Sequence, residues 1–112
     1  MTVLDDSVLM PICGNDRDAL RDLLELSVQE TVTMLTTLTT AWHARDFGRI
    51  ADAAHRLKGQ SATIGAKELA DAAAQLEVWA RRGDEGTGSP ALLDAVSRAV
   101  ARFRSEVQRR LG

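Results

Sequence analysis

The chain has 112 residues, which fits one domain around one hydrophobic core, and we expect residues 1–112 to form a single domain. The hydrophobic fraction of 45% includes few aromatic residues and no tyrosine, which favours helices over strands. The net charge of −2 offers no basic stripe, so a protein partner is favoured over nucleic acid. A lone cysteine and the lack of an apolar run of roughly 18 residues predict a cytoplasmic protein that does not enter membranes.

The N-terminal segment, residues 4–13, has the pattern of a short amphipathic helix. Leu4, Val8, Leu9 and Ile12 fall on one helical face, which is expected to pack across a bundle. Cys13 follows apolar neighbours and is expected to be a small buried side chain.

A long second helix is predicted to follow Gly14. Asn15 is the expected N-cap, with Asp16 and Asp18 in the first turn. The threonine-rich stretch 31–40 has weak helix propensity, but its apolar residues keep the helical spacing, so we expect no break. The predicted stripe comprises Leu20, Leu23, Leu24, Val28, Thr31, Leu35, Leu38 and Trp42.

Three further helices are predicted from cap residues and apolar stripes. Asp46 caps the third helix, which ends at Gly65, and Gly83 ends the fourth. Ser89 and Pro90 are a start signal for the last helix. The predicted buried positions are Ile50, Ala54, Leu57, Ser61 and Ile64, then Leu69, Ala72, Ala73, Leu76, Trp79 and Ala80, then Leu93, Val96, Val100, Phe103, Val107 and Leu111. The expected fold is all-α, an antiparallel up-down-up-down four-helix bundle with a short extra N-terminal helix.

The third helix also carries an unusual second face. At helical spacing this face reads Gly48, Ala51, His55, Gly59 and Ala62, so one imidazole stands among small residues. A glycine inside a helix costs on the order of 1 kcal/mol relative to alanine, which suggests that the empty surface is useful.

Lys58 follows His55 by three residues, close enough to place an ammonium group beside the ring. A histidine, a cation and cleared space suit transfer of an anion to the ring. The alternative is a solvated helix face on which Gly59 serves only close helix packing, and spacing alone leaves both interpretations open.

Other chemistries fit the sequence less well. The second histidine, His43, belongs to a different predicted helix, and ligand-like spacing of cysteines or carboxylates is absent, so no metal site is expected. Ser61 is predicted to be buried and Cys13 is remote, which disfavours a hydrolase. The sequence has no glycine-rich ATP-binding loop, so a phosphoryl group must come from another protein.

The segment AHRLKGQSATIGA, residues 54–66, followed by Leu69 and Leu76-Glu77, resembles the signature of histidine-containing phosphotransfer (HPt) domains. The order of the predicted helices matches that family along nearly the whole chain. The resemblance implies that His55 is the phosphorylated histidine and Lys58 its electrostatic support. It also implies that Gly59 clears space for a receiver domain.

The resemblance further marks positions around this site. Some HPt domains place a glutamine and an arginine of the fourth helix near the phosphohistidine, and the matching positions here are Glu77 and Arg81. Arg81 is expected to bind phosphoryl oxygens. Glu77 either orients the imidazole or Lys58, or is an ordinary surface residue, which the sequence slightly favours. Gln60 either reaches the receiver or faces solvent. The expected binding positions are therefore Gly59, Gln60, Ala51, Ala62, Glu77 and Arg81.

The function implied by the resemblance is reversible phosphoryl transfer through a ring nitrogen, expected to be Nε2. The partners are receiver domains of response regulators and hybrid histidine kinases, which supply Mg²⁺, and the chain itself is expected to be a monomeric phosphocarrier with no cofactor rather than an enzyme. The N-terminal segment with Val8, Leu9 and Ile12 is expected to join the docking surface. The alternatives are direct phosphorylation by a histidine kinase, a non-catalytic helical adaptor, and a bundle that serves self-association.

Overall fold

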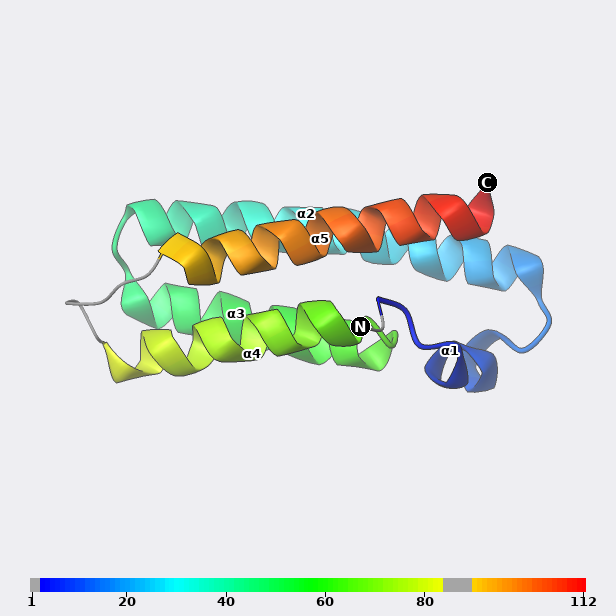
Figure 1. The fold of residues 1–112 in the computed structure, drawn as a ribbon, viewed down its shortest axis with the longest axis horizontal. Helices are drawn as coiled ribbons and strands as arrows, with labels where there is room; N and C mark the ends of the chain where they lie inside the picture. The colour runs from blue at the N-terminus through cyan, green and yellow to red at the C-terminus, as the bar shows by residue number, and fades with distance from the viewer. Residues whose placement is uncertain (1–2, 84–89) are drawn as a thin grey trace.

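The computed structural model describes residues 3–83 and 90–112, whose regular structure is entirely helical. Four long helices form an antiparallel bundle in which α2 packs on α3, α3 on α4, α4 on α5, and α5 back on α2 (Figure 1). The predicted up-down-up-down bundle with a short N-terminal helix is confirmed. In the described residues none of the helices is both long and apolar enough to span a bilayer. The helices are α1 (Asp6–Cys13), α2 (Arg17–His43), α3 (Phe47–Thr63), α4 (Lys67–Arg82) and α5 (Pro90–Leu111).

Helix α2 is continuous through its threonine-rich half, as predicted. The Thr36 and Thr40 hydroxyls, for example, donate to the carbonyls four residues earlier, so they add no unsatisfied polar groups. The predicted cap is displaced by one residue: the Asp16 carboxylate accepts from the Ala19 amide at 3.0 Å, and Asn15 precedes the cap. Both residue types cap helices well, so sequence preference did not separate them.

The turn between α3 and α4 sets these two helices side by side. The Asp46 carboxylate caps α3 by accepting from the Arg49 amide at 3.1 Å, as predicted. After α3 ends, Gly65 has a φ of +76°, and a Cβ there would lie only 2.9 Å from the Asp5 carbonyl oxygen. This turn therefore requires glycine, both for its backbone conformation and for the close approach of the N-terminal segment.

Gly83 ends α4 in the left-handed conformation, as predicted. Ser89, the predicted cap of α5, lies outside the described residues.

The predicted stripes meet in the core of the bundle. Its fully buried members include Leu24, Leu38, Leu57, Leu76 and Phe103, one or two from each long helix. Ser61 is also buried, as expected from its place on the inner face of α3. Such packing supplies most of the stability of helices in water, which explains why weak local propensity in α2 did not matter.

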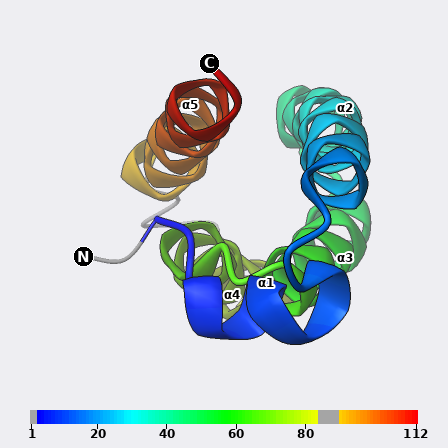
Figure 2. The same ribbon diagram turned by 90° about the vertical axis from the view of Figure 1, so that its right-hand side faces the viewer.

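Helix α1 packs less completely than predicted. It lies beyond the ends of α3 and α4, so neighbours cover only part of it (Figures 1 and 2). Leu4 and Leu9 are buried, but Ile12 is 52% exposed and Cys13 is only half-buried. The expectations that Ile12 packs across the bundle and that Cys13 is buried are therefore wrong.

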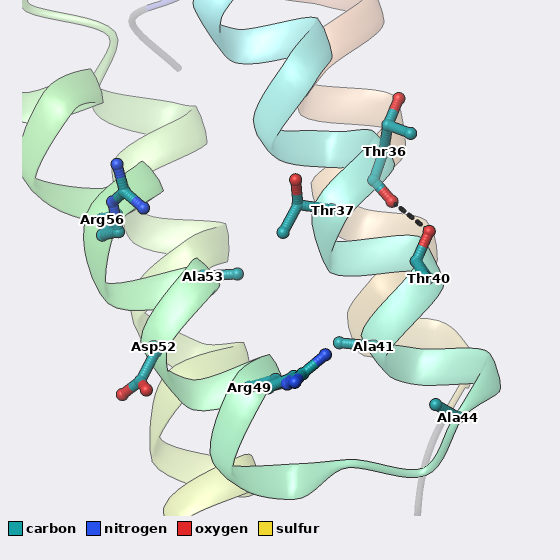
Figure 3. A pocket seen from close by; sticks show the side chains of 9 residues that line it. All are labelled: Thr36, Thr37, Thr40, Ala41, Ala44, Arg49, Asp52, Ala53 and Arg56. Carbon is teal, nitrogen blue, oxygen red and sulfur yellow. Dashed lines mark hydrogen bonds between the residues drawn. The ribbon is translucent and has the colours of Figure 1, made fainter.

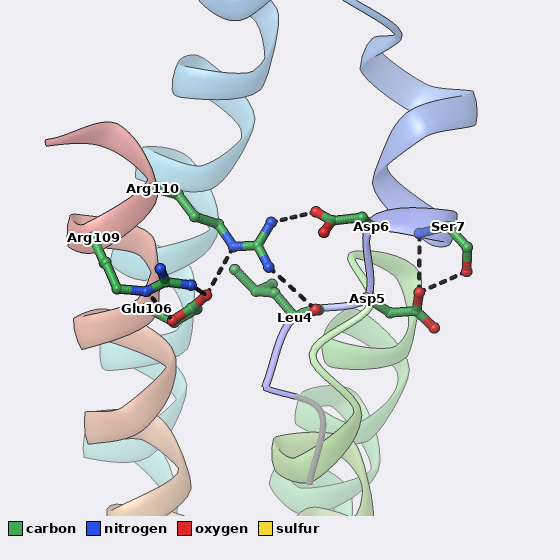
Figure 4. Close-up of polar contacts among 7 residues, drawn as sticks. All are labelled: Leu4, Asp5, Asp6, Ser7, Glu106, Arg109 and Arg110. Atoms are coloured by element: carbon green, nitrogen blue, oxygen red, sulfur yellow. Dashed lines mark hydrogen bonds and ion pairs between the residues drawn. The ribbon is translucent and has the colours of Figure 1, made fainter.

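Polar contacts tie the N-terminal segment to the end of α5 (Figure 4). The Arg110 guanidinium donates to the Leu4 carbonyl at 3.4 Å and pairs with Asp6, while its Nε donates to Glu106 at 3.0 Å. Glu106 also accepts from Arg109, and these hydrogen bonds lower the pKa of Glu106 to about 2. We call Leu4, Asp6, Glu106 and Arg110 the N-terminal clamp.

Candidate functional site

His55 stands on the outer face of α3 with 60% of its side chain exposed. Gly48, Gly59 and Ala62 of the predicted bare face are exposed as well. Ala51 is different, because it is only 2% exposed and belongs to the core. Four residues turn a helix by about 400°, so Ala51 is rotated from His55 by about 40° toward the packed interior. The prediction that Ala51 belongs to a binding surface is therefore wrong.

Glu77 of α4 is the central acceptor of the site. Its side chain is 9% exposed. Its Oε2 lies 3.0 Å from His55 Nδ1, and its Oε1 lies 3.0 Å from Lys58 Nζ. The Nε and Nη2 atoms of Arg81 both lie 2.9 Å from Oε2. Glu77 is thus buried and connects three residues, so its interpretation as an ordinary surface residue is wrong.

The cations around Glu77 keep it ionised. The hydrogen bond from Lys58 has the largest effect on the pKa of Glu77, and the hydrogen bond from Arg81 lowers this pKa further. Together they outweigh the opposing effect of burial and lower the pKa of Glu77 to about 2. The carboxylate is therefore charged at neutral pH and accepts hydrogen bonds without donating any.

This charge state selects one tautomer of His55. Because ionised Glu77 only accepts hydrogen bonds, the neutral imidazole places its proton on Nδ1. The lone pair then resides on Nε2, the ring nitrogen that does not contact Glu77. The site consequently presents an oriented imidazole whose side chain is largely exposed.

The same cluster carries a net positive charge. The single carboxylate of Glu77 faces two basic side chains, Lys58 and Arg81, which are 38% and 52% exposed. Both cations are therefore accessible beside the imidazole while Glu77 holds them in place. This arrangement favours the approach of an anion. The expected binding of phosphoryl oxygens by Arg81 stays a prediction.

Gly59 and Gln60 border the site on the side of α2. A Cβ at Gly59 would meet no other atom within 4 Å, so this glycine is not required for helix packing. The Gln60 Nε2 donates to the Glu30 carboxylate of α2, and its Oε1 is buried. Gln60 thus cross-links α2 and α3, so the alternative that it merely faces solvent is wrong, while its contact with a receiver stays a prediction. Glu30, its partner, was not recognised from sequence, because no local pattern marks contacts between helices.

Comparisons with known proteins agree with this geometry. The family model for the Hpt domain matches residues 22–107, a span that includes every residue of the site. The fold is similar to the crystal structure of histidine-containing phosphotransfer protein B (HptB) from Pseudomonas aeruginosa PAO1, with a TM-score of 0.88 and 32% sequence identity. That match covers 97% of this chain and 94% of the other.

A search of curated proteins returned no match. The family model nevertheless spans most of the chain, and the structural match exceeds 30% identity over nearly its full length. The chain therefore belongs to the Hpt domain family.

Proposed function

We propose that this chain is a phosphocarrier of a phosphorelay, which accepts a phosphoryl group on His55 from the aspartyl-phosphate of one receiver domain and passes it to another. The observation that carries the proposal is the contact of Glu77 with His55 Nδ1, because it leaves Nε2 as the nucleophile. Membership of the Hpt family and the similarity to HptB support the same role.

Transfer to His55 needs few groups from this chain. The Nε2 lone pair forms a bond to phosphorus while the bond between phosphorus and the aspartate oxygen breaks, and the aspartate leaves as a carboxylate. Nε2 carries no proton, so none has to be removed. The ring gains positive charge as the new bond forms, and the Glu77 carboxylate at Nδ1 stabilises that charge.

Lys58 and Arg81 act on the negative charge of the phosphoryl group rather than on the positive charge of the ring. Their partly exposed side chains contact the same carboxylate as the imidazole, and from there they stabilise the negative oxygens of the phosphoryl group. Glu77 positions these cations as well as the imidazole. One buried carboxylate thus positions both the nucleophile and its electrostatic support. The reverse transfer, from His55 to a second receiver, uses the same contacts.

The remaining requirements come from the partner. In this proposal Mg²⁺ is supplied by receiver domains of response regulators or hybrid histidine kinases, and this chain works as a carrier rather than an enzyme. It acts as a cytoplasmic monomer, without nucleic acid or membrane. The docking surface comprises the exposed positions around His55, which include Gly59, Ala62 and Arg81. Ala51 is buried and is not part of it. Of the N-terminal segment, Leu9 is buried, which leaves only the exposed part of α1 for contact.

The test compares His55→Gln with His43→Gln in the full chain. Both histidines are exposed, but His43 lies at the end of α2, away from the Glu77 cluster. Isolated phosphorylated receivers should label the wild-type protein and the His43 variant with an acid-labile phosphoryl group, while the His55 variant stays unlabelled and folded. Undiminished labelling of the His55 variant would falsify the assignment. Labelling by a histidine kinase but by no receiver would favour direct phosphorylation instead.

A further inference from the structure

A groove runs between α2 and α3 beside the site (Figure 3). Ala41 of α2 and Ala53 of α3 face each other across it, and Arg49 reaches from α3 toward Ala41. Arg56 lies further along the same wall and also lines a neighbouring recess that contains Met34. Arg56 thus stands where these two hollows meet, one residue after His55. We call the hollow shown in Figure 3 the α2–α3 groove.

Most of the polar groups of the groove are already satisfied. The hydroxyls of Thr36, Thr37 and Thr40 donate to carbonyls of their own helix, and Arg49 pairs with Asp46 at 3.3 Å. Arg56 is exposed and has neither an ion-pair nor a hydrogen-bond partner among residues 3–83 and 90–112. The groove therefore has an alanine floor lined by two charged side chains without an ion-pair partner in the described residues, Asp52 and, one turn later on α3, Arg56. The Arg56 end suits a carboxylate on a short aliphatic stem, whereas Asp52 would repel such a group from the other end.

The position of the groove places its Arg56 end under any receiver that reaches His55. A specific interface buries about 800 Å² on each partner, which corresponds to a disc of roughly 16 Å radius. Arg49 is six residues from His55, or about 9 Å along the helix axis, and Arg56 is adjacent to His55. A neighbouring packed helix such as α2 lies about 8–10 Å away. Arg49 and Arg56 are turned by about 120° and 100° from His55 around α3, so the end of the groove at Arg56, next to His55, is the part that falls within the expected footprint.

We propose that the α2–α3 groove is a specificity site for the receiver domain, in which Arg56 pairs with a carboxylate side chain outside the phosphorylation pocket of the receiver. This inference rests on the function proposed above and adds a residue that selects the partner without touching the transferred group. A charge at such a position acts mainly on encounter and on salt dependence, because it steers the partner before the reacting groups meet.

The test uses Arg56→Glu in the full chain and the matched control Arg98→Glu. Arg98 is an exposed arginine of α5, the helix diagonal to α3. Its replacement by glutamate makes the same change in charge at a position away from the groove. The probe is the phosphorylated receiver of the source organism that transfers fastest to the wild-type protein. Phosphoramidate, a small phosphodonor without a protein surface, reports on the nucleophile itself. Thermal melting verifies that both variants fold, and Arg56→Gln replaces Arg56→Glu if the latter does not.

Arg56→Glu should raise the half-saturating receiver concentration about tenfold relative to Arg98→Glu, because a like charge replaces an opposite one at the contact. The ratio of receiver-dependent transfer to phosphoramidate labelling should fall correspondingly, and the salt dependence of transfer should weaken. A receiver variant with a matching acidic residue changed to arginine should restore transfer to Arg56→Glu.

Equal half-saturating concentrations for the two variants would overturn the specificity site and leave the proposed function intact. A loss that is independent of salt would also overturn it, because the proposed contact is ionic. If no receiver transfers to wild-type His55, the proposed function fails, and the specificity site fails with it.

Discussion

Replacing Glu77 by Gln tests the arrangement of the site most directly, because it removes the charge of the central acceptor and keeps its shape. The pKa of Glu77 falls from its ordinary value of 4.5 to about 2 in the folded protein. Without screening, such a shift corresponds to about 3 kcal/mol of stability. His55, Lys58 and Arg81 are partly exposed, so water reduces the contribution to about 1–2 kcal/mol.

The pH dependence of this contribution has a definite sign. The folded-state pKa is depressed, so the stabilisation is fully present above pH 4.5 and is lost as the pH falls through about 2. Urea unfolding should therefore show Glu77→Gln to be less stable than the wild type by about 1–2 kcal/mol at pH 7. The difference between the two proteins should shrink progressively below pH 4.5.

The same substitution should also impair transfer. A glutamine amide can present either its oxygen or its NH₂ group to Nδ1, so the Nδ1–H tautomer of His55 is no longer enforced. A charge-assisted hydrogen bond contributes about 1.5 kcal/mol, and its loss should slow receiver-to-His55 transfer roughly tenfold. Imidazole ¹⁵N NMR should report the tautomer, and rapid-quench assays should report the rate.

Glu106→Gln is the control for this experiment. Glu106 has a similarly lowered pKa, held by Arg109 and Arg110, but it lies in the N-terminal clamp. Its substitution should lower stability at pH 7, by a difference that shrinks over the same acid range, without slowing transfer. If Glu77→Gln keeps both the Nδ1–H tautomer and the wild-type transfer rate, Glu77 does not orient the nucleophile.

Two further predictions concern glycines. Gly59→Gln should leave the melting temperature equal or higher, because a Cβ there meets no atom within 4 Å and glycine is a poor helix former. Transfer from the receiver should nevertheless fall sharply. Normal transfer would show that Gly59 does not clear space for the receiver. Gly65→Ala should lose about 1–3 kcal/mol of stability in urea unfolding, because its φ is +76° and the added Cβ would press on Asp5; a wild-type unfolding midpoint would show that the turn can relax.

The helices were predictable because each long helix buries a continuous stripe. In α5, for example, the buried residues Val96, Val100, Phe103 and Val107 recur every three or four positions, and this repeat decides which side faces the core. The ends were less certain where two adjacent residues had similar capping ability, as at Asn15 and Asp16. The exposure of Ile12 was not predictable, since it depends on α1 lying past the end of the α3–α4 pair.

The candidate site was predictable only in part. His55, Lys58 and Gly59 share one helix, so their spacing and their resemblance to a known signature were enough to bring them together. The resemblance marked Glu77 as a candidate to orient the imidazole or Lys58. Its actual contacts depend on which turn of α4 lies opposite His55, and the pairing of Gln60 with Glu30 depends on the register between α2 and α3. Side-chain packing in the core sets these registers, and no local pattern in the sequence encodes them.

The N-terminal clamp has a consequence for how the chain folds. Arg110 joins Leu4 and Asp6, which are 106 and 104 residues away along the chain. Closing so long a loop carries a large entropic cost, whereas most neighbouring helices of the bundle are joined by short turns. During synthesis the segment around Leu4 emerges before α5 and cannot complete its contacts until α5 has been made. We therefore expect α1 to dock last. Protection of the α1 backbone amides from hydrogen exchange should then appear only when the whole bundle has formed.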